Sequence, residues 1–239
     1  PENLMVKAFT SIYKGDLGKF SIRFQNNIPL ARGLGSSATA IIGGLFAANT
    51  LLGNIYTKEE LLERAISIEG HPDNVTPSVL GGFTISYKVG GKYKNIRIDP
   101  PDLYVYLIIP DYKLETEKMR RVLPDAYKRE DVIYNISRAS LVVSAFLRDD
   151  FSLLFDALFD KIHEPYRGKF INGYFELKDN LYREGNSICT ISGSGPTISC
   201  FSKKDNLEDL IKEYIVKYNM KAKIIKTNPS MYGVKVETL

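Results

Sequence analysis

The strongest local signal in this sequence is the stretch Pro29-Leu30-Ala31-Arg32-Gly33-Leu34-Gly35-Ser36-Ser37-Ala38-Thr39. Its two glycines permit a left-handed backbone and let a ligand approach the main chain closely. An apolar run continues to residue 53 and predicts a long helix that begins at the serines. Because the first N–H groups of a helix are unpaired and lie at its positive end, we expect this stretch to bind phosphate, with a serine hydroxyl near a metal ion held by the phosphates.

Other interpretations of the same stretch are open. A helix capped by Ser36 would use the glycines only for the turn, but capping explains one serine and not the whole segment. A Walker A loop requires a lysine after the glycines, and none follows. The letters Gly33-x-Gly35-x-x-Ala38 match a dinucleotide fingerprint, yet the position where an acidic residue is expected, about 20 residues later, is Ile55.

The composition excludes several classes of protein. The chain has 239 residues, of which 44% are hydrophobic and 25% charged, as in a globular protein and unlike a disordered, collagen-like or coiled-coil chain. The net charge of +4 comes from 32 basic and 28 acidic residues that are interleaved along the sequence. This mild excess is compatible with a small anionic ligand and argues against a nucleic-acid partner.

No segment predicts membrane insertion or secretion. The stretch 36–53 contains Gly, Ser, Thr and Asn, so we expect a buried helix, and the charged first residues do not form a secretory signal. Cys189 and Cys200 have neither metal-ligand spacing nor a disulfide framework, so we expect a cytoplasmic protein. The sequence starts without Met, and we expect it to begin inside a longer protein.

Helical and strand patterns are mixed along the chain, and they predict an α+β fold. Pro100-Pro101 is the expected boundary between two domains, 1–100 and 101–239. The first expected helix ends near residue 13. Further helices are expected at 36–53, 57–69, 115–123, 130–148, 152–162, 171–183 and 207–218. The expected strands span 20–24, 83–89, 92–98, 103–109, 187–191, 197–201, 221–227 and 232–236, with a loop at 71–77.

A second segment of interest joins a helix to this loop. Glu63 lies on the helix, and His71, Asp73 and Asn74 follow within the loop. Carboxylates suit Mg²⁺, which takes a few oxygen ligands from a protein. The alternative is structural, with Asp73 as the N-cap of a further short helix.

A third segment, Gly193-Ser194-Gly195-Pro196, lies between two apolar strands. It is longer than a tight hairpin requires, so its N–H groups are candidates for binding an anion or another loop. Arg120 and Arg167 are candidates for holding a carboxylate through two parallel hydrogen bonds.

These segments, in this order, resemble the GHMP kinase superfamily. Residues 29–38 are similar to its phosphate loop, and Ser-Gly-Ser-Gly-Pro-Thr at 192–197 is similar to its third motif. Glu-Gly-His-Pro-Asp-Asn at 69–74, the Thr116 to Arg120 pattern and Glu-Pro-Tyr-Arg-Gly-Lys at 164–169 resemble the homoserine kinases within it. The resemblance implies a two-domain fold, with an N-terminal part like domain 2 of ribosomal protein S5 and a ferredoxin-like C-terminal part.

The resemblance also implies an activity, the ATP- and Mg²⁺-dependent phosphorylation of L-homoserine in threonine biosynthesis. Asn3 would lie near the adenine, and Pro29–Thr39 would surround the ATP phosphates. Ser37 would bind Mg²⁺ with Glu63 as its carboxylate partner.

For the acceptor, the resemblance implies contacts from His71, Asp73 and Asn74 and from the third motif at Gly193 and Ser194, with Arg120 and Arg167 holding the carboxylate. Thr116 would lie near the transferred phosphoryl group. Asp73 matches the position of a base in mevalonate kinase-like relatives.

The family's first motif is absent, and it normally helps to hold the substrate. We therefore expect little activity from this chain by itself. The alternatives are another GHMP kinase, acting on shikimate, mevalonate or an isoprenoid alcohol, a nucleotide-binding domain without catalysis, and a nicotinamide-binding oxidoreductase. A homodimer is compatible with the resemblance.

Overall fold

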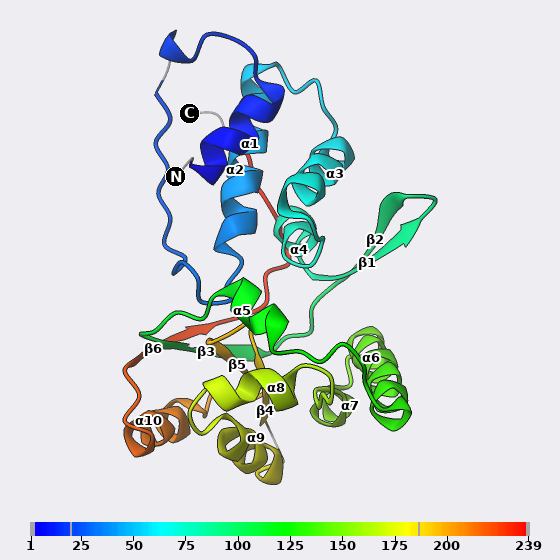
Figure 1. Ribbon diagram of the computed structural model, residues 1–239, viewed down its shortest axis with the longest axis vertical. Coiled ribbons are helices and arrows are strands. Elements are labelled where there is room, and N and C mark those ends of the chain that lie inside the picture. The colour runs from blue at the N-terminus through cyan, green and yellow to red at the C-terminus, as the bar shows by residue number, and fades with distance from the viewer. Residues whose placement is uncertain (1–2, 20, 186, 238–239) are drawn as a thin grey trace. The chain divides into compact units, whose positions relative to one another are not determined.

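The computed structural model describes residues 3–19, 21–185 and 187–237 (Figure 1). The chain forms two compact units: the first comprises residues 1–28, 35–99 and 230–239, and the second comprises 29–34 and 100–229. The longest continuous segments of the two units, 35–99 and 100–229, meet at Pro100. The domains expected from sequence, 1–100 and 101–239, are contiguous, whereas the two units are not. Segment 29–34 belongs to the second unit, and segment 230–239 belongs to the first.

The first unit consists of helices around a small core, with one β-hairpin. Its elements are α1 (Leu4–Ile12), the 3₁₀ turn η1 (Leu17–Lys19), α2 (Ser36–Leu51), α3 (Lys58–Glu69), α4 (Val75–Leu80), β1 (Phe83–Val89) and β2 (Lys92–Ile98). The core forms where α1, α2 and α3 meet, and it contains the fully buried side chains of Phe9, Ile41, Leu45 and Leu61.

A glycine allows α1 and α2 to pack closely. A β-carbon at Gly44, in the middle of α2, would overlap the carbonyl oxygen of Met5 and lie 3.1 Å from the Ala8 β-carbon. The close contact explains why α2 contains a glycine despite the cost of about 1 kcal/mol relative to alanine in a helix interior. The position of α2 in this core also determines where its N-terminus points.

Two local signals of the first unit form as the sequence predicts. Thr57 and Glu60 make a capping box at the start of α3, with Glu60 N–H donating to Thr57 Oγ1 (3.2 Å) and Thr57 N–H donating to Glu60 Oε2 (2.8 Å). The hairpin turns at Gly90 and Gly91, which both have positive φ, +57° and +81°, as a tight two-residue turn requires.

The second unit is a four-stranded antiparallel sheet with helices on both faces. Its strands are β3 (Tyr104–Pro110), β4 (Ser187–Ile191), β5 (Ile198–Ser202) and β6 (Ala222–Thr227), in the order β4-β5-β3-β6. Its helices are α5 (Thr116–Arg121), α6 (Arg129–Arg148), α7 (Phe151–Ala157), α8 (Glu164–Arg167), the 3₁₀ turn η2 (Gly168–Phe170), α9 (Tyr174–Arg183) and α10 (Glu208–Lys217).

The sheet divides the core of the second unit into two clusters. Successive residues of a strand point to opposite faces. Val105 accordingly packs with side chains of α6 and α7, whereas Tyr106 and Ile108 pack with side chains of α9 and α10. The mixed fold expected from sequence is confirmed.

Two expected strands and two expected boundaries are wrong. Residues 21–28 and 232–237 form neither helix nor strand, although Ile22 and Phe24 or Tyr232 and Val236 alternate with polar residues; Phe20 lies outside the described residues. Alternation reports side-chain spacing, and a strand also needs a partner for its backbone groups. The expected loop at 71–77 contains the start of α4, and the helix expected to reach residue 162 ends at Ala157.

Candidate functional site

The N-terminus of α2 follows two glycines with left-handed backbones. The φ angles are +76° at Gly33 and +70° at Gly35. Gly35 is the N-cap residue and has no side chain with which to cap the helix. The first helical hydrogen bond runs from Thr39 N–H to the Gly35 carbonyl (3.2 Å). The N–H groups of residues 36–38 therefore precede the helical hydrogen-bond ladder, as an anion site at a helix start requires.

The two serines at this helix start have different partners. The Ser36 hydroxyl accepts a hydrogen bond from Asn26 Nδ2 (2.9 Å). The Ser37 hydroxyl donates to Glu69 Oε2 (2.6 Å), so a carboxylate from the end of α3 lies next to the start of α2. One hydroxyl and one carboxylate are oxygen ligands of the kind that Mg²⁺ takes together with substrate phosphates.

The carboxylate in contact with Ser37 is not the one expected from sequence. Glu63 is exposed and lies six residues before Glu69, about 120° away around α3. The local sequence pattern does not mark Glu69, because its contact with Ser37 spans 32 residues of sequence. Among the described residues, no group of three or more His, Cys, Asp or Glu side chains is arranged to hold a metal ion by itself.

The loop after α3 contains three expected acceptor residues: Asn74 lies against the start of α2, and His71 lies beside Asp73. The Asn74 side chain packs against Gly35, where an added β-carbon would be 3.5 Å from Asn74 Oδ1. His71 Nδ1 lies 3.9 Å from Asp73 Oδ2 and has no hydrogen-bond partner among the residues described. This ring nitrogen is buried, and the acceptor contact expected for His71 stays a prediction.

In the second unit, the Gly33 segment packs directly against the third motif. Ser192 Oγ donates to the Gly33 carbonyl (2.8 Å), and Thr197 N–H donates to the Arg32 carbonyl (3.4 Å). A β-carbon at Gly33 would overlap the carbonyl oxygen of Ser192. Gly33 therefore has two reasons to be glycine, its left-handed backbone and this close approach.

Arg32 and Asn3 have structural partners. Arg32 Nε donates to the Pro110 carbonyl (2.9 Å), and a second guanidinium nitrogen lies 3.9 Å from Asp111 Oδ1. Asn3 is the N-cap of α1, and its Oδ1 accepts from Met5 N–H (3.0 Å). Leu30 is exposed and Ala31 has a positive φ of 55°. The nucleotide contacts expected for these residues stay predictions.

Arg167 is fixed by two backbone carbonyls. Its Nε donates to Met119 (3.1 Å) and its NH1 to Gly193 (3.3 Å). Burial lowers the pKa of this guanidinium, Asp160 opposes that shift, and the like charge of Arg120 lowers it further. Arg120 is thus close enough to influence the charge of Arg167, and the carboxylate-binding role expected for the two arginines stays a prediction.

Arg167 also borders open space. It lines a cavity of about 340 Å³ together with His163 and Gly193. Next to it, Thr116 Oγ1 and Ser194 Oγ lie 3.3 Å apart, so α5 and the third motif each contribute a hydroxyl. The second unit therefore brings together the expected residues Thr116, Gly193, Ser194 and Arg167, with Arg120 near Arg167.

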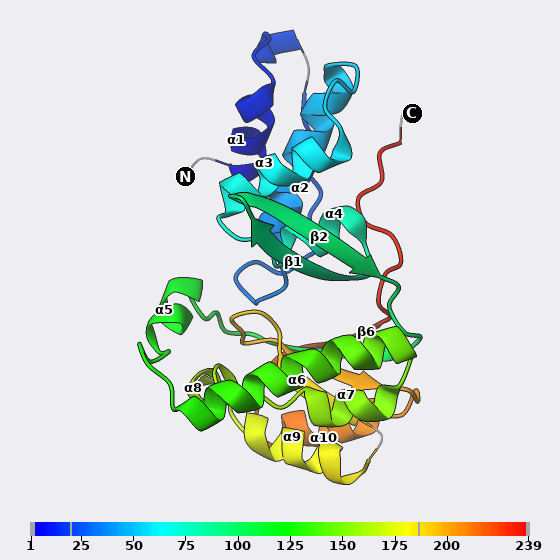
Figure 2. The ribbon, with the colours of Figure 1, turned by 90° about the vertical axis from the view of Figure 1, so that its right-hand side faces the viewer.

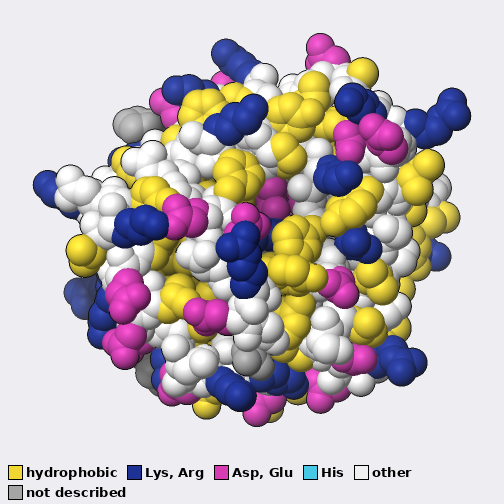
Figure 3. All heavy atoms as spheres, turned by 90° about the horizontal axis from the view of Figure 1, so that it is seen from below, with side chains coloured by type: hydrophobic (Ala, Val, Ile, Leu, Met, Phe, Trp, Pro, Cys, Tyr) yellow, Lys and Arg dark blue, Asp and Glu magenta, His cyan; other side chains and the backbone are white. Residues whose placement is uncertain are grey.

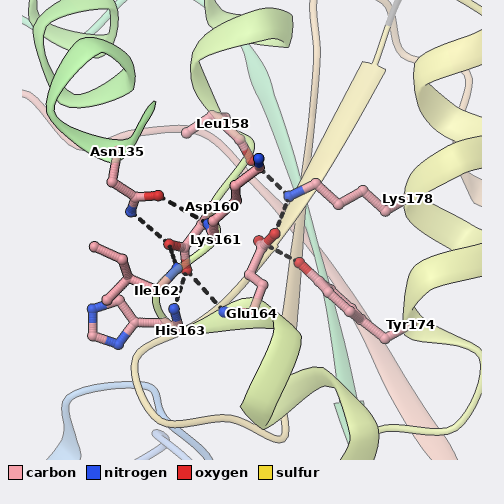
Figure 4. Close-up of polar contacts among 9 residues, drawn as sticks. All are labelled: Asn135, Leu158, Asp160, Lys161, Ile162, His163, Glu164, Tyr174 and Lys178. Atoms are coloured by element: carbon pink, nitrogen blue, oxygen red, sulfur yellow. Dashed lines mark hydrogen bonds and ion pairs between the residues drawn. The ribbon is translucent and has the colours of Figure 1, made fainter. Parts of the chain in front are cut away.

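A polar cluster that sequence reasoning missed supports the chain leading to Arg167 (Figure 4). Asp160 accepts from Asn135 Nδ2 (2.6 Å) and from the N–H groups of Ile162 (2.7 Å), His163 (2.8 Å) and Glu164 (2.8 Å). These hydrogen bonds hold the pKa of Asp160 below its usual value, although burial opposes them. Asp160 thereby organises the turn before α8, at whose end Arg167 lies.

The same cluster contains a buried ion pair. Glu164 accepts from Lys178 Nζ (2.5 Å) and from the Tyr174 hydroxyl (2.5 Å), while Lys178 also donates to the Leu158 carbonyl (2.6 Å). Burial raises the pKa of Glu164 against the opposing influence of Lys178. No motif predicts this pair, because its two residues lie 14 positions apart in the sequence and only a tertiary contact brings them together.

Replacing Lys178 with methionine is expected to lower the free energy of unfolding by about 3–5 kcal/mol at neutral pH, because Glu164 would be left as an unpaired buried charge. The missing lysine raises the folded-state pKa of Glu164 further. An acid with a raised folded pKa loses stability as pH rises, so the deficit should shrink as pH falls toward the unfolded value of about 4.3. Urea denaturation followed by circular dichroism, from neutral pH down to about pH 4.3, measures this loss of unfolding free energy.

Two variants control for this result. The double variant Lys178→Met, Glu164→Gln removes both charges and should recover stability, and it should lose the pH dependence. Lys217→Met removes a comparable pairing with Glu176, which lies at the surface, and it should leave stability nearly unchanged. A pH-independent deficit in Lys178→Met would contradict the role given to Glu164.

Comparisons with known proteins show which proteins this chain resembles. Residues 3–82 match the GHMP kinases N terminal domain. The homoserine kinase of Clostridium novyi is 41% identical over 226 residues, which cover 90% of this chain and 74% of that protein. The crystal structure of homoserine kinase from Cytophaga hutchinsonii superposes with a TM-score of 0.80 at 28% identity, covering 87% of this chain and 69% of that one.

A more distant structure has the same fold and a different acceptor in its name. Phosphomevalonate kinase of Streptococcus pneumoniae superposes with a TM-score of 0.61 at 9% identity, covering 81% of this chain and 68% of that one. At that identity the likeness concerns the fold alone. Because the Clostridium enzyme is 41% identical and is covered over 74% of its length, the chain belongs to the homoserine kinase family of the GHMP kinases.

Proposed function

We propose that this chain transfers the γ-phosphoryl group of ATP to the side-chain hydroxyl of L-homoserine, with Mg²⁺, as a step of threonine biosynthesis. Membership of the homoserine kinase family supports the reaction. The observation that carries the proposal is the contact of Ser37 Oγ with Glu69 at the N-terminus of α2, after two left-handed glycines. That arrangement supplies backbone donors for phosphate oxygens and oxygen ligands for a divalent cation.

At the nucleotide, the chain acts by positioning and by offsetting charge. Phosphoryl transfer depends mainly on alignment of the attacking and leaving oxygens and on neutralising the charge of the phosphoryl group. The free N–H groups of residues 36–38 would bind phosphate oxygens, and Ser37 and Glu69 would hold Mg²⁺. Bound there, Mg²⁺ would neutralise charge on the phosphates. Glu63 is the alternative carboxylate ligand of Mg²⁺, and the variants Glu69→Gln and Glu63→Gln distinguish the two.

At the acceptor, two arginines would hold the substrate's carboxylate. Arg167 keeps unused guanidinium N–H groups after its bonds to two backbone carbonyls. Arg120, whose charge influences the pKa of Arg167, would bind the same carboxylate. His71 and Asn74 would contact the rest of the acceptor, Asp73 would orient His71, and Thr116 and Ser194 would lie near the reacting hydroxyl.

Acceptor preference tests the proposal. ADP release is expected to be fastest with L-homoserine and at least about tenfold slower with shikimate, mevalonate or an isoprenoid alcohol, because those lack the α-amino acid head group that a site built for it requires. ATP binding without turnover on any acceptor would identify a nucleotide-binding domain instead. Nicotinamide binding would identify an oxidoreductase.

We further propose a cytoplasmic location and no nucleic-acid partner. Cys189 and Cys200 are both buried free thiols. Acidic and basic side chains are interspersed on the face shown in Figure 3, which lacks the continuous basic surface expected of a nucleic-acid site. Among the described residues, no helix is both long and apolar enough to cross a membrane.

A further inference from the structure

The helix that carries Arg167 is too short to hold its own position. α8 spans Glu164–Arg167, a single turn, and residues 158–163 before it form neither helix nor strand. Isolated helices of fewer than about 12 residues are marginal in water, because few backbone hydrogen bonds offset the entropy lost on ordering the chain. The position of the Arg167 side chain therefore depends on the contacts that neighbouring elements make with α8.

Asp160 fixes the start of α8 with both oxygens of its carboxylate (Figure 4). Its Oδ1 accepts from Asn135 Nδ2 (2.6 Å) and from Ile162 N–H (2.7 Å). Its Oδ2 accepts from the N–H groups of His163 and Glu164, both at 2.8 Å. Each oxygen thus serves two donors, and three of the four donors are backbone groups at the entrance to α8.

These hydrogen bonds connect α8 to α6. Asn135 belongs to α6, and its Oδ1 also accepts from Lys161 N–H (2.9 Å), so its amide group holds the turn at two points. Figure 2 shows the N-terminal half of α6 next to α8. From this turn the connection reaches Arg167 itself, because the Arg167 N–H donates to the His163 carbonyl (3.0 Å).

A second anchor joins α8 to α9 and does not involve Asp160. Glu164, the first residue of α8, accepts from Lys178 Nζ (2.5 Å) and from the Tyr174 hydroxyl (2.5 Å), and both donors lie on α9. This buried pair remains when Asp160 is replaced. We therefore expect that removing the first anchor displaces α8 and leaves the second unit folded.

The guanidinium of Arg167 depends on this placement. It donates to the Met119 carbonyl of α5 (3.1 Å) and to the Gly193 carbonyl of the third motif (3.3 Å). Hydrogen bonds weaken steeply outside a narrow range of distance and angle, so a displaced α8 would misalign the guanidinium. We propose that Asp160 is a positioning residue for the acceptor: by fixing the start of α8, it holds Arg167 where the substrate's carboxylate binds. This inference rests on the carboxylate-binding role that the proposed function gives to Arg167.

Position and charge predict opposite effects of Asp160 on acceptor binding. Asp160 raises the pKa of the Arg167 guanidinium, so its charge acts at this site. That negative charge also repels a carboxylate, and by charge alone Asp160→Asn would lower the KM for homoserine. Asparagine, however, has one side-chain oxygen, and its NH2 group would face two of the four donors that Asp160 now binds. The start of α8 would lose two hydrogen bonds, and the KM would rise.

Asp160→Asn is the first test. We expect the KM for homoserine to rise about tenfold while kcat and the KM for ATP change less than about twofold, because only the alignment of the carboxylate is disturbed. The matched control is Asp150→Asn. Asp150 caps α7 in the same unit and accepts from Ser152 N–H (3.1 Å), so its replacement should lower stability without changing the KM. An unchanged or lower KM in Asp160→Asn would overturn the proposal.

Asn135→Ala makes the test independent of how well Asp160→Asn folds. It removes one of the four donors and leaves the carboxylate in place, so circular dichroism should show a folded chain. The KM for homoserine is expected to rise about threefold, because the turn before α8 is held less firmly. A KM equal to that of the parent would overturn the role given to Asp160.

A double variant shows whether Asp160 acts through Arg167. Asp160→Asn combined with Arg167→Ala should have the KM of Arg167→Ala alone, whereas independent effects would multiply to about 10³-fold and contradict the proposal. A parent chain that phosphorylates no acceptor would instead refute the proposed function. In that case hydrogen exchange decides the anchoring: Asp160→Asn should speed amide exchange at residues 162–167, Asp150→Asn should not, and equal rates in the two variants would overturn it.

Discussion

Replacing Glu69 with glutamine is expected to lower kcat by about 10²–10³-fold while leaving the KM for homoserine nearly unchanged. The amide keeps the size of the side chain but removes the negative charge that faces Ser37 Oγ at 2.6 Å. The expected size is that of removing one electrostatic stabiliser of a transition state. A steady-state ADP-release assay measures it, and titration with Mg²⁺ should show a higher requirement for the ion.

Two further variants on α3 make this prediction specific. Glu63→Gln tests the carboxylate that the sequence pattern favours, and Glu59→Gln, at an exposed position in the first helical turn, is the neutral control. The geometry predicts a large loss in Glu69→Gln alone. A large loss in Glu63→Gln with little effect of Glu69→Gln would transfer the metal-binding role to Glu63. No loss in either would remove the carboxylate from the mechanism.

Replacing Arg167 with alanine is expected to raise the KM for homoserine about 10²-fold and to leave ATP binding nearly intact. The reason is the loss of one charged partner of a carboxylate in a partly buried site, which costs about 2–5 kcal/mol. Arg167→Lys should recover little, because lysine cannot form the paired hydrogen bonds of a guanidinium. Calorimetric titration with a non-hydrolysable ATP analogue separates nucleotide binding from acceptor binding.

Arg121→Ala is the matched control for this variant. Arg121 is 81% exposed at its side chain and pairs with Glu117 one helical turn away, so its removal should change neither constant. Equal losses in homoserine and ATP affinity in Arg167→Ala would contradict a dedicated carboxylate role. That outcome would point instead to the hydrogen bonds that Arg167 makes to Met119 and Gly193.

Signals that act within a few residues were predictable from the sequence. The capping box of Thr57 and Glu60 and the turn at Gly90 and Gly91 depend on backbone geometry that those residue types favour locally. The same holds for the glycines before α2. Their positive φ angles follow from the residue type, and the helix after them follows from the apolar run.

Features that depend on contacts between distant segments were not predictable. Glu69 meets Ser37 across 32 residues of sequence, and Glu164 meets Lys178 from another helix. The alternation at Ile22 and Phe24 is a true spacing pattern, but the sequence does not say whether a neighbouring strand exists. Packing decides such cases, and packing is a property of the whole unit.

The assignment of segments 29–34 and 230–239 to opposite units has a consequence for dissecting this chain. The polypeptide passes from one unit to the other four times, at residues 28/29, 34/35, 99/100 and 229/230. No single cleavage therefore yields two intact units. A cut at Pro100 would leave segment 29–34 of the second unit on the N-terminal fragment and segment 230–239 of the first unit on the C-terminal fragment. Proteolysis or truncation there should produce fragments that regain their structure only when mixed.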